Sequence, residues 1–356
     1  MKKISLDIIG IVGVPARYGG FETLVERLLQ DKDFSKTFNT RVFCSTNKYQ
    51  KKYKSFLGAK LFYLPLNANG IQSILYDALS IFISIFSKSE AILILGTSGA
   101  IFMPFIKTFT SKKLVVNIDG MEWKRDKWSP ITRFILKFFE RVAVKCSDVV
   151  ITDNEVITKY VKTEYDRDSS LISYGGDNHV SKSICPSFLN KKKYYLSICR
   201  IEKENNVKLI LDAFAKNKKK HLYFIGNWEA SKYGRSLKKT YSQLKNINLI
   251  DPIYDESKLN YLRKNADGYL HGHSAGGTNP SLVETMFFET TIFAFDCEFN
   301  RSTLNNMGIY FQDSNQLNDL LELNLEEYDS SLTVEYAKKN YLWSYICKKY
   351  IYILSK

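Results

Sequence analysis

The most specific string of residues in this chain is HGHSAGGTNPSLVE, which runs from His271 to Glu284. An apolar strand pattern ends at its start, two glycines open a loop, and Thr278 or Asn279 can cap a helix that has Pro280 in its first turn. Because the start of a helix presents unpaired N–H groups, this string predicts an anion-binding site. Glu284 lies about one turn into that helix, where its carboxylate is placed to bind ribose hydroxyls.

Two histidines stand at the beginning of the same string, two residues apart. Residues with this spacing on a strand share a face, so His271 and His273 are a conceivable metal pair. No third ligand lies near them in the sequence, and a zinc site needs three or four protein ligands. We therefore expect these side chains to orient the loop, and we predict no metal site.

A second glycine-rich string, from Gly13 to Glu22, lies between the first strand pattern and the first helix pattern. Glycines let the backbone approach a ligand closely, and a helix N-terminus attracts phosphate. The spacing is not GxGxxG, and no acidic residue closes a second strand, which excludes a nicotinamide fingerprint. A phosphate-binding turn and a merely tight strand-to-helix turn are both compatible with this string.

Two charged loops follow other strand patterns. The loop from Asp119 to Trp128 combines carboxylates, cations and indoles. Carboxylates can position or deprotonate a hydroxyl, indoles stack on sugar faces and cations hold phosphate, so we interpret it as an acceptor site, with a solvated loop as the alternative. The loop from Arg200 to Asn206 offers a guanidinium that can grip a diphosphate, or is an ordinary charged loop.

Short apolar runs alternate with longer amphipathic runs over the whole chain, which predicts parallel sheets covered by helices on both faces. The alternation breaks over residues 177–193, which we interpret as a linker. We thus predict an α/β fold with two doubly wound Rossmann-like domains. The first covers residues 1–180 and the second residues 181–335. A single long amphipathic helix is predicted over 334–354, and we assign 336–356 as a segment that packs back on the first domain.

The composition fits a globular protein, with 45% hydrophobic and 25% charged residues among 356. Six widely spaced cysteines with no CxxC pair are typical of reduced thiols and argue against a disulfide scaffold. The net charge of +14 is uneven, because residues 1–150 hold 23 Lys and Arg against 12 Asp and Glu. Such a basic half indicates an anionic partner. No apolar run is long enough to predict a transmembrane helix.

Together, these strings resemble the family 4 retaining glycosyltransferases of the GT-B fold, and more narrowly the bacterial rhamnosyltransferase branch that builds capsule, O-antigen or rhamnose-rich wall polysaccharide. The resemblance extends over essentially the whole chain. It is carried by PARYGGFET at 15–23, DGMEWKR at 119–125, RIEKENN at 200–206 and GGTNPSLVE at 276–284, with Trp343 and Tyr350 matching the closing helix. It implies an acceptor-binding first domain, a donor-binding second domain facing it across a cleft, and a C-terminal helix that crosses back.

The resemblance also implies roles for individual residues. Transfer with retention, without an obligatory bound metal or other cofactor, would use Asp119 or Glu122 to position the acceptor, Arg200 to stabilise the diphosphate and Glu284 to hold the ribose. Donor-binding residues would be Gly19, Gly20, Arg200, Asn205, Gly276, Gly277, Thr278, Asn279, Pro280, Ser281, Leu282 and Glu284. Acceptor-binding residues would be Arg17, Tyr18, Trp123, Lys124 and Arg125.

Two departures from the broader family affect the donor. Its paired glutamates would fall at positions 276 and 284, and here the first is Gly276; its lysine five residues after Arg200 is here Asn205. The rhamnosyltransferase branch resembles this chain at both positions, which implies dTDP-L-rhamnose as the donor and a lipid-diphosphate-linked saccharide as the acceptor. A UDP- or GDP-hexose donor remains an alternative, as do another sugar-nucleotide enzyme such as an epimerase or phosphorylase, a degenerate binding scaffold and a nucleic-acid-binding protein, although no nucleic-acid-binding module is visible.

Two basic-aromatic segments favour peripheral binding to the inner face of the plasma membrane from the cytoplasm. Along the predicted helix 130–146, cations recur every four residues beside apolar ones, at Arg133, Lys137, Arg141 and Lys145. Lysines alternate with tyrosines over 48–54. Each surface cation contributes on the order of 1 kcal/mol near an anionic leaflet. An ordinary amphipathic helix with a solvated face is the alternative.

Overall fold

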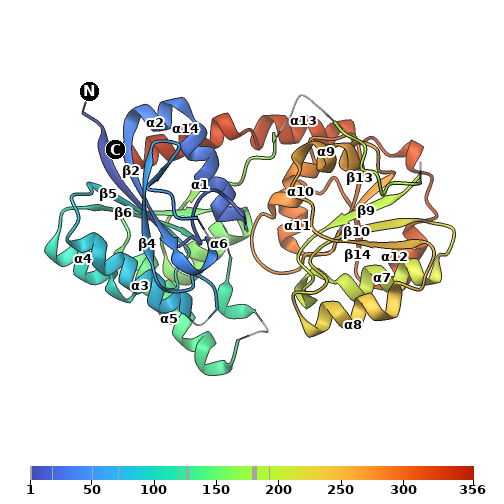
Figure 1. The fold of residues 1–356 in the computed structure, drawn as a ribbon, viewed down its shortest axis with the longest axis horizontal. Helices are drawn as coiled ribbons and strands as arrows, with labels where there is room; N and C mark the ends of the chain where they lie inside the picture. The colour runs from blue at the N-terminus through green and yellow to red at the C-terminus, as the bar shows by residue number, and fades with distance from the viewer. Residues whose placement is uncertain are drawn as a thin grey trace. The chain divides into compact units, whose positions relative to one another are not determined.

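The computed structural model describes residues 2–17, 19–49, 51–70, 72–118, 120–125, 128–178, 183–191 and 193–356. The chain forms two compact units (Figure 1). The first combines Met1–Tyr174 with Trp343–Lys356, and the second is Gly175–Leu342. The corresponding boundaries predicted from the sequence are 180 and 335. Among the described residues, no helix is both long and apolar enough to cross a membrane.

The first unit is built on an eight-stranded sheet with the order β3-β4-β2-β1-β5-β6-β7-β8. Its strands are β1 (Ile4–Ile9), β2 (Phe38–Ser45), β3 (Ser55–Phe56), β4 (Ala59–Leu64), β5 (Ala91–Leu95), β6 (Lys113–Ile118), β7 (Val149–Thr152) and β8 (Ser170–Leu171). All neighbours pair in parallel except β3, which pairs with β4 antiparallel. The central strands are buried on both faces and therefore consist of almost continuous apolar runs.

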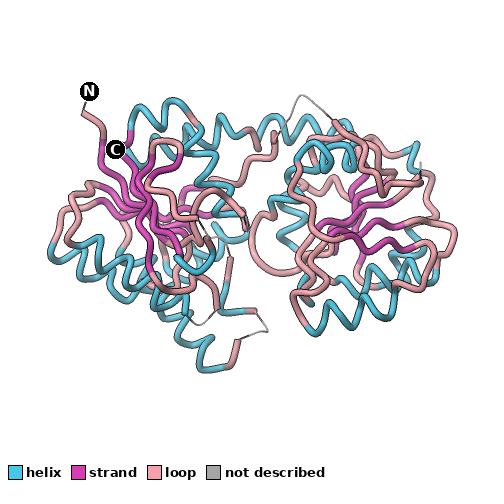
Figure 2. Tube along the Cα trace, viewed as in Figure 1, coloured by secondary structure: helices cyan, strands magenta, loops and turns pink. Residues whose placement is uncertain are grey.

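Helices cover both faces of the first sheet (Figures 1 and 2). They are α1 (Gly20–Gln30), α2 (Lys32–Thr37), α3 (Gln72–Ile85), α4 (Met103–Phe109), α5 (Pro130–Cys146), α6 (Glu155–Tyr165) and α14 (Trp343–Ser355), with short 3-10 turns η1 (Thr46–Lys48), η2 (Ala100–Phe102) and η3 (Glu122–Lys124). One core joins α1, α2 and α14 to the sheet. On the other face α3, α4 and α5 pack side by side. The C-terminal helix α14 thus completes the first unit.

The second unit has a six-stranded parallel sheet with the order β11-β10-β9-β12-β13-β14. Its strands are β9 (Tyr195–Ile198), β10 (Leu222–Ile225), β11 (Ile247–Ile250), β12 (Gly268–His271), β13 (Thr291–Phe295) and β14 (Ile309–Phe311). Its helices are α7 (Val207–Lys216), α8 (Lys232–Tyr241), α9 (Glu256–Lys264), α10 (Pro280–Thr285), α11 (Glu298–Thr303), α12 (Ser314–Leu320) and α13 (Ser331–Asn340), with turns η4 (Lys203–Asn205) and η5 (Leu325–Glu327). Two cores, one on each face, hold these layers together.

The predicted α/β class with two doubly wound parallel sheets is confirmed, and two local expectations, a first strand over 4–14 and a single C-terminal helix, are wrong. The first strand ends at Ile9, because Gly10 turns the chain with a positive φ, whereas the apolar run continues to Val14. Several elements were not predicted, among them α8, which is mostly polar. The single C-terminal helix is in fact two, because Tyr341 packs in the second unit and donates to Thr303 O, while Trp343 begins a helix of the first.

Candidate functional site

Each sheet reverses its strand order at one point, and ligands of doubly wound folds bind beyond the carboxyl ends of the strands at such a point. In the first unit the reversal lies between β1 and β5, and in the second between β9 and β12. The predicted strings at 13–22, 200–206 and 276–284 follow β1, β9 and β12. The string at 119–125 follows β6, which neighbours β5. The sheet topology therefore brings every predicted motif to a ligand-binding edge of its own unit.

In the second unit, the loops after β9 and β12 are tied to each other by side-chain hydrogen bonds. The buried Asn205 donates to Arg200 O over 2.7 Å, and its Oδ1 lies 2.7 Å from Nδ1 of His273. Asn206 donates to Gly272 O over 2.9 Å. The two asparagines therefore fix the backbone positions of both loops. Asn205, which was predicted to contact the donor, has a positioning role in the structure.

Arg200 lies at the edge of this frame. Its side chain is 45% exposed, and its guanidinium is 3.8 Å from Glu202 and 4.0 Å from Glu204. Ion pairs that are this long and this exposed are weak. The Glu204 carbonyl also accepts from the backbone and hydroxyl of Ser274, which ties the β9 loop to the β12 loop once more. Arg200 is therefore placed on a rigid loop with a head group that is accessible to an anion.

The start of α10 is built as the sequence predicts, but it is short. Asn279 caps the helix by accepting from Ser281 N over 3.0 Å, and Pro280 follows it. Ser281 Oγ lies 2.6 Å from the Tyr269 hydroxyl, while Leu282 is buried in the core, so only its backbone can meet a ligand. Gly277 and Thr278 are buried as well. With its cap in place and no N–H on proline, this end offers few free donors of its own, so the predicted anion site depends on the loop before it.

Gly276 is the residue that makes the close turn of this loop possible. Its φ of +103° is in the region that favours glycine, and a Cβ there would lie 3.2 Å from Nε2 of His273. A glutamate at this position, as in the broader family, would therefore strain the backbone and press on the histidine.

Glu284 is engaged on both carboxylate oxygens. Oε1 accepts from Asn178 over 2.8 Å, and Oε2 pairs with Arg263, which is 4% exposed. The Glu284 side chain itself is 19% exposed, so one edge remains accessible. The sequence analysis missed Arg263 and Asn178. Arg263 stands beside Lys264 in a mostly polar helix, so nothing in the local sequence marks it as buried.

The two histidines belong to the frame. His273 Nδ1 contacts Asn205, and its carbonyl accepts from Asn300 over 2.8 Å. Burial lowers the pKa of His271 to about 3, so it is neutral at physiological pH. Among the described residues, no group of three or more His, Cys, Asp or Glu side chains is placed to hold a metal ion. All six cysteines are free thiols.

In the first unit, the glycine-rich loop is held by a buried acid. Glu22 of α1 accepts from Val12 N over 2.8 Å. Gly19 has a φ of +100° and caps the helix that begins at Gly20, and a Cβ at Gly19 would meet Glu22 Oε2 at 2.6 Å. Only glycine fits there. Arg17 is exposed, with its guanidinium carbon 5.2 Å from the ring centre of Tyr49. Tyr18 lies outside the described residues.

The loop after β6 is internally paired. Asp119 lies outside the described residues. Glu122 accepts from Arg125 over 2.8 Å and from Trp128 Nε1 over 3.0 Å. Trp123 is covered by cations, since the Lys137 ammonium lies 4.5 Å from its ring centre and the exposed Lys124 5.4 Å from it. These contacts order the loop. A sugar that stacks on Trp123 must use the part of the ring that the two lysines do not cover.

Two parts of the predicted basic-aromatic surface point inwards. Lys137 lies 3.1 Å from Glu164 and 3.6 Å from the buried Glu140, so it belongs to an internal cluster. Tyr49 is buried and donates to Pro15 O over 2.9 Å. The predicted every-fourth-residue stripe is therefore interrupted at Lys137, because its long side chain reaches the carboxylates of neighbouring segments.

Asp77 is a further candidate that the sequence analysis did not select. It is buried on α3 and accepts from Ser98 Oγ over 2.6 Å, in the loop after β5 at the switch point of the first unit. Burial raises its pKa to about 7. A carboxyl group with this pKa can exchange a proton near neutral pH. Its signal in the sequence is a lone acid inside an otherwise apolar helix.

Comparisons with known families divide the chain at nearly the same place. Residues 186–340 match the family "Glycosyl transferases group 1", and residues 2–177 match "Domain of unknown function (DUF1972)". No curated protein shows significant sequence similarity to the chain. The second unit therefore carries a glycosyl transferases group 1 domain, which includes Arg200 and the string at 276–284.

Solved structures show the same fold over nearly the full chain. Sucrose-phosphate synthase from Thermosynechococcus elongatus has a TM-score of 0.80 at 13% identity and covers 98% of this chain and 97% of its own. HepE from Anabaena, in complex with UDP-glucose, has a TM-score of 0.73 at 13% identity and covers 99% and 100%. The catalytic domain of starch synthase IV from Arabidopsis thaliana, bound to ADP and acarbose, has a TM-score of 0.71 at 12% identity and covers 100% and 99%.

These matches define the chain as a protein of the GT-B glycosyltransferase fold. More particularly, it combines a DUF1972 first unit with a glycosyl transferases group 1 second unit. The predicted fold and the glycosyltransferase group are confirmed at this level. The rhamnosyltransferase branch, the donor, the acceptor and the individual site residues stay predictions.

Proposed function

We propose that the protein is a retaining glycosyltransferase that moves L-rhamnose from dTDP-L-rhamnose to a lipid-diphosphate-linked saccharide during synthesis of capsule, O-antigen or cell-wall polysaccharide. The observation that carries this proposal is the second unit itself. This unit matches glycosyl transferases group 1, and Arg200 and the GGTNPSLVE string follow β9 and β12, the two strands that flank its switch point. Two hydrogen-bonded loops support both motifs, as preorganised binding requires.

In this proposal, Arg200 takes up negative charge as the diphosphate leaves. Its guanidinium is held on a fixed loop and its two acidic neighbours bind it weakly, so a diphosphate can replace them. The loop over Gly276–Ser281 supplies the second contact to the phosphates. Glu284 holds the ribose with its accessible edge, and its buried partner Arg263 fixes the direction of the carboxylate.

The first unit would bind the acceptor. Glu122 is ordered by Arg125 and Trp128, and with Asp119 it is the candidate to position the acceptor hydroxyl. The basic first half of the chain suits a diphosphate-linked lipid at the inner face of the plasma membrane. A UDP-hexose donor is the second candidate, because HepE, with which this chain shares its fold, is in complex with UDP-glucose.

Thermal unfolding with a panel of nucleotides tests the donor. We expect dTDP and dTDP-L-rhamnose to raise the unfolding midpoint, since a ligand that binds only the folded state stabilises it by mass action. Arg200→Ala should abolish most of this shift and lower transfer about 100-fold or more. A shift with UDP-glucose or GDP-mannose alone would reject rhamnose as the donor sugar.

Lys264→Ala is the matched control, because it also removes an exposed cation from the second unit. Lys264 ends α9 just before β12 and thus lies at the opposite edge of the sheet from Arg200. It should leave the nucleotide shift unchanged. Equal losses in the two variants would overturn the role of Arg200. The anomeric configuration of the product, measured by NMR, tests retention separately.

A further inference from the structure

Helix α3 exposes an apolar side to solvent, which a helix on a protein surface normally does not do. Its buried side mixes polar and apolar residues, which are Tyr76, Asp77, Ala78, Ser80, Ile81 and Ser84. Its outward side carries Leu75, Leu79, Phe82 and, just past its end, Phe86, all exposed. These four lie at spacings of four, three and four, so they form one face. Surface helices normally turn the polar side outwards.

The two helices beside α3 continue this pattern. From η2 into α4, Ile101, Phe105 and Phe109 are exposed at every fourth position. On α5 the exposed apolar residues are Ile131, Phe134, Ile135 and Phe138. We call the outward apolar residues of these three helices the aromatic face.

The aromatic face is continuous across α3 and α4. Phe82 contacts Phe86 and Phe102, with ring centres 5.4 and 5.7 Å apart. Phe102 contacts Phe105 at 5.9 Å, and Phe105 contacts Phe109 at 6.4 Å. Helix α5 packs against both η2 and α4. Single exposed apolar residues are common on proteins, but a contiguous patch marks an interaction surface.

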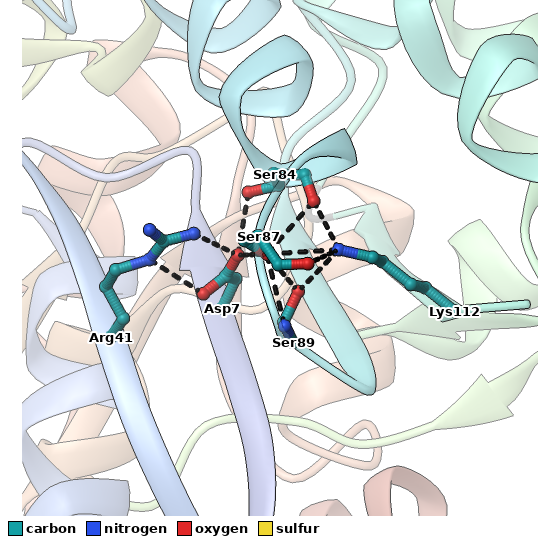
Figure 3. A network of polar contacts seen from close by, with 6 residues as sticks. All are labelled: Asp7, Arg41, Ser84, Ser87, Ser89 and Lys112. Carbon is teal, nitrogen blue, oxygen red and sulfur yellow. Dashed lines mark hydrogen bonds and ion pairs between the residues drawn. The ribbon is translucent and has the colours of Figure 1, made fainter. Parts of the chain in front are cut away.

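A polar network fixes the end of α3 that bears Phe82 and Phe86 (Figure 3). Ser84 and Ser87 each donate to Asp7 over 2.9 Å, and Arg41 pairs with Asp7 at 2.6 Å. Lys112 donates to the carbonyls of Ser84 and Ser87 over 2.6 Å, where a cation complements the helix dipole. The aromatic face therefore belongs to a rigidly held element of the fold.

Among the described residues of these three helices, the exposed charges without an ion-pair partner are cations. The only acidic residue in α3 is Asp77 and in α5 is Glu140, both buried, and α4 has none. Arg141 and Lys145 are exposed on α5, and within the described part of the chain neither has an ion-pair partner. Asp148, after α5, is paired with Lys107 of α4. An apolar face whose described part has unpaired cations but no unpaired carboxylate complements an anionic lipid surface.

We infer that the aromatic face docks on an anionic lipid bilayer, with the phenylalanine rings of α3, α4 and α5 entering the interface and Arg141 and Lys145 meeting lipid phosphates. This inference deepens the membrane part of the proposed function and identifies the surface that performs it. The membrane contact is thereby assigned to an apolar face with a basic end, and not to the predicted basic stripe. It rests on exposure and charge, and it is independent of the sugar donor.

A second copy of the chain fits this face less well than a bilayer. A symmetric dimer joins the same patch of both subunits. The basic end of α5 would then meet cations of the partner patch, and the described residues of the face offer no unpaired carboxylate to compensate them. Like charges across an interface are unfavourable. A bilayer supplies apolar chains and phosphates together.

Flotation of the full chain with vesicles tests the inference. We expect binding to phosphatidylcholine vesicles that contain phosphatidylglycerol, and weaker binding at high salt or without the anionic lipid. The key variant is Phe86→Ser/Phe109→Ser/Phe134→Ser, which changes one residue per helix with side chains 76%, 71% and 76% exposed. It should lower the partition coefficient at least about tenfold, because the rings no longer insert. Arg141→Gln and Lys145→Gln should each lower it about fivefold on anionic vesicles only.

The matched control removes three exposed apolar side chains from the second unit, as Tyr254→Ser/Leu323→Ser/Leu332→Ser. It should float like the unchanged protein. Equal flotation of the two triple variants, or no flotation of the unchanged protein, overturns the inference. A lipid-free dimer that the first triple variant converts to a monomer also overturns it, in favour of a self-interface.

The donor test separates this inference from the proposed function. The first triple variant should keep the unfolding midpoint of the unchanged protein and the midpoint shift with dTDP. If the unchanged protein binds no nucleotide yet floats on anionic vesicles, the proposed function fails and the docking surface stands. If the unfolding midpoint falls sharply in the first triple variant but not in the control variant, the face supports the fold and the docking inference fails.

Discussion

The two units of this protein share one sheet architecture but use it in opposite ways. In the second unit, the loops at the switch point are tied by Asn205, Asn206 and Ser274, and exposed positions on α8 are polar. In the first unit, the corresponding loops rest on buried acids, and the exposed positions of α3 after Gln72 are apolar. The shared fold therefore fixes where a ligand can bind in each unit, while the side chains of that unit decide which groups contact the ligand.

The difference concerns how each unit stabilises buried charge. Glu284 in the second unit is neutralised by a buried arginine and one amide. Asp7 in the first unit has an arginine and also two serine hydroxyls. Asp77 has Ser98 as its hydrogen-bond partner, and burial raises its pKa to about 7. Both acids thus have an arginine partner, and Asp7 has one more hydrogen-bond donor from other side chains than Glu284.

The largest effect expected from this comparison is the loss of protein stability when the arginine of each ion pair is removed. Arg263→Met should lower the free energy of unfolding by about 3 kcal/mol, because it leaves the mostly buried Glu284 without its cation. Arg41→Met should cost less, about 1–2 kcal/mol, since Asp7 keeps two hydroxyl donors. Urea unfolding of both variants at neutral pH measures the two values.

A double variant controls this prediction. Arg263→Met/Glu284→Gln removes both charges and should recover a large part of the loss, because an uncharged amide is cheaper to bury than an unpaired carboxylate. Equal losses for Arg263→Met and Arg41→Met would contradict the idea that the first unit distributes its hydrogen bonds.

A smaller effect concerns pH. The pKa of Asp77 is raised to about 7 by burial, from 3.8 in the absence of the fold. Between these values the unfolded chain loses the proton and the folded protein keeps it, so stability falls as pH rises towards 7. We therefore compare the free energy of unfolding of Asp77→Asn with that of the unchanged protein at the same pH. This difference should be about 2–3 kcal/mol more in favour of Asp77→Asn at pH 7.5 than at pH 5. Urea titrations across this range would reject the assignment if the difference between the two proteins stayed constant with pH.

How far the sequence predicts this molecule depends on whether a property is local. Strands such as Ala91–Leu95 and the Asn279 cap follow from short patterns, and both are present. The Arg263–Glu284 pair joins residues 21 positions apart on different helices, so no local pattern reveals it. Tyr341 separates α13 from α14 because the two helices pack in different cores, which a helical period cannot show. The outward apolar side of α3 was hidden for a similar reason, since hydropathy does not say which face the sheet covers.

The smallest expected effect tests whether the second unit's loops act as one rigid frame. Asn205→Ala removes the contacts to Arg200 O and His273, and should lower the free energy of unfolding by about 1–2 kcal/mol. If the frame positions Arg200, the same variant should also weaken dTDP binding several-fold, because a looser loop must be ordered on binding. Lys208→Ala, which removes an exposed cation of α7 paired with Asp212, should change neither quantity much. Nucleotide affinity from titration calorimetry and stability from urea unfolding measure the two effects separately. A stability loss with unchanged affinity would mean that the asparagine only holds the fold, and that Arg200 finds the diphosphate without help from the β12 loop.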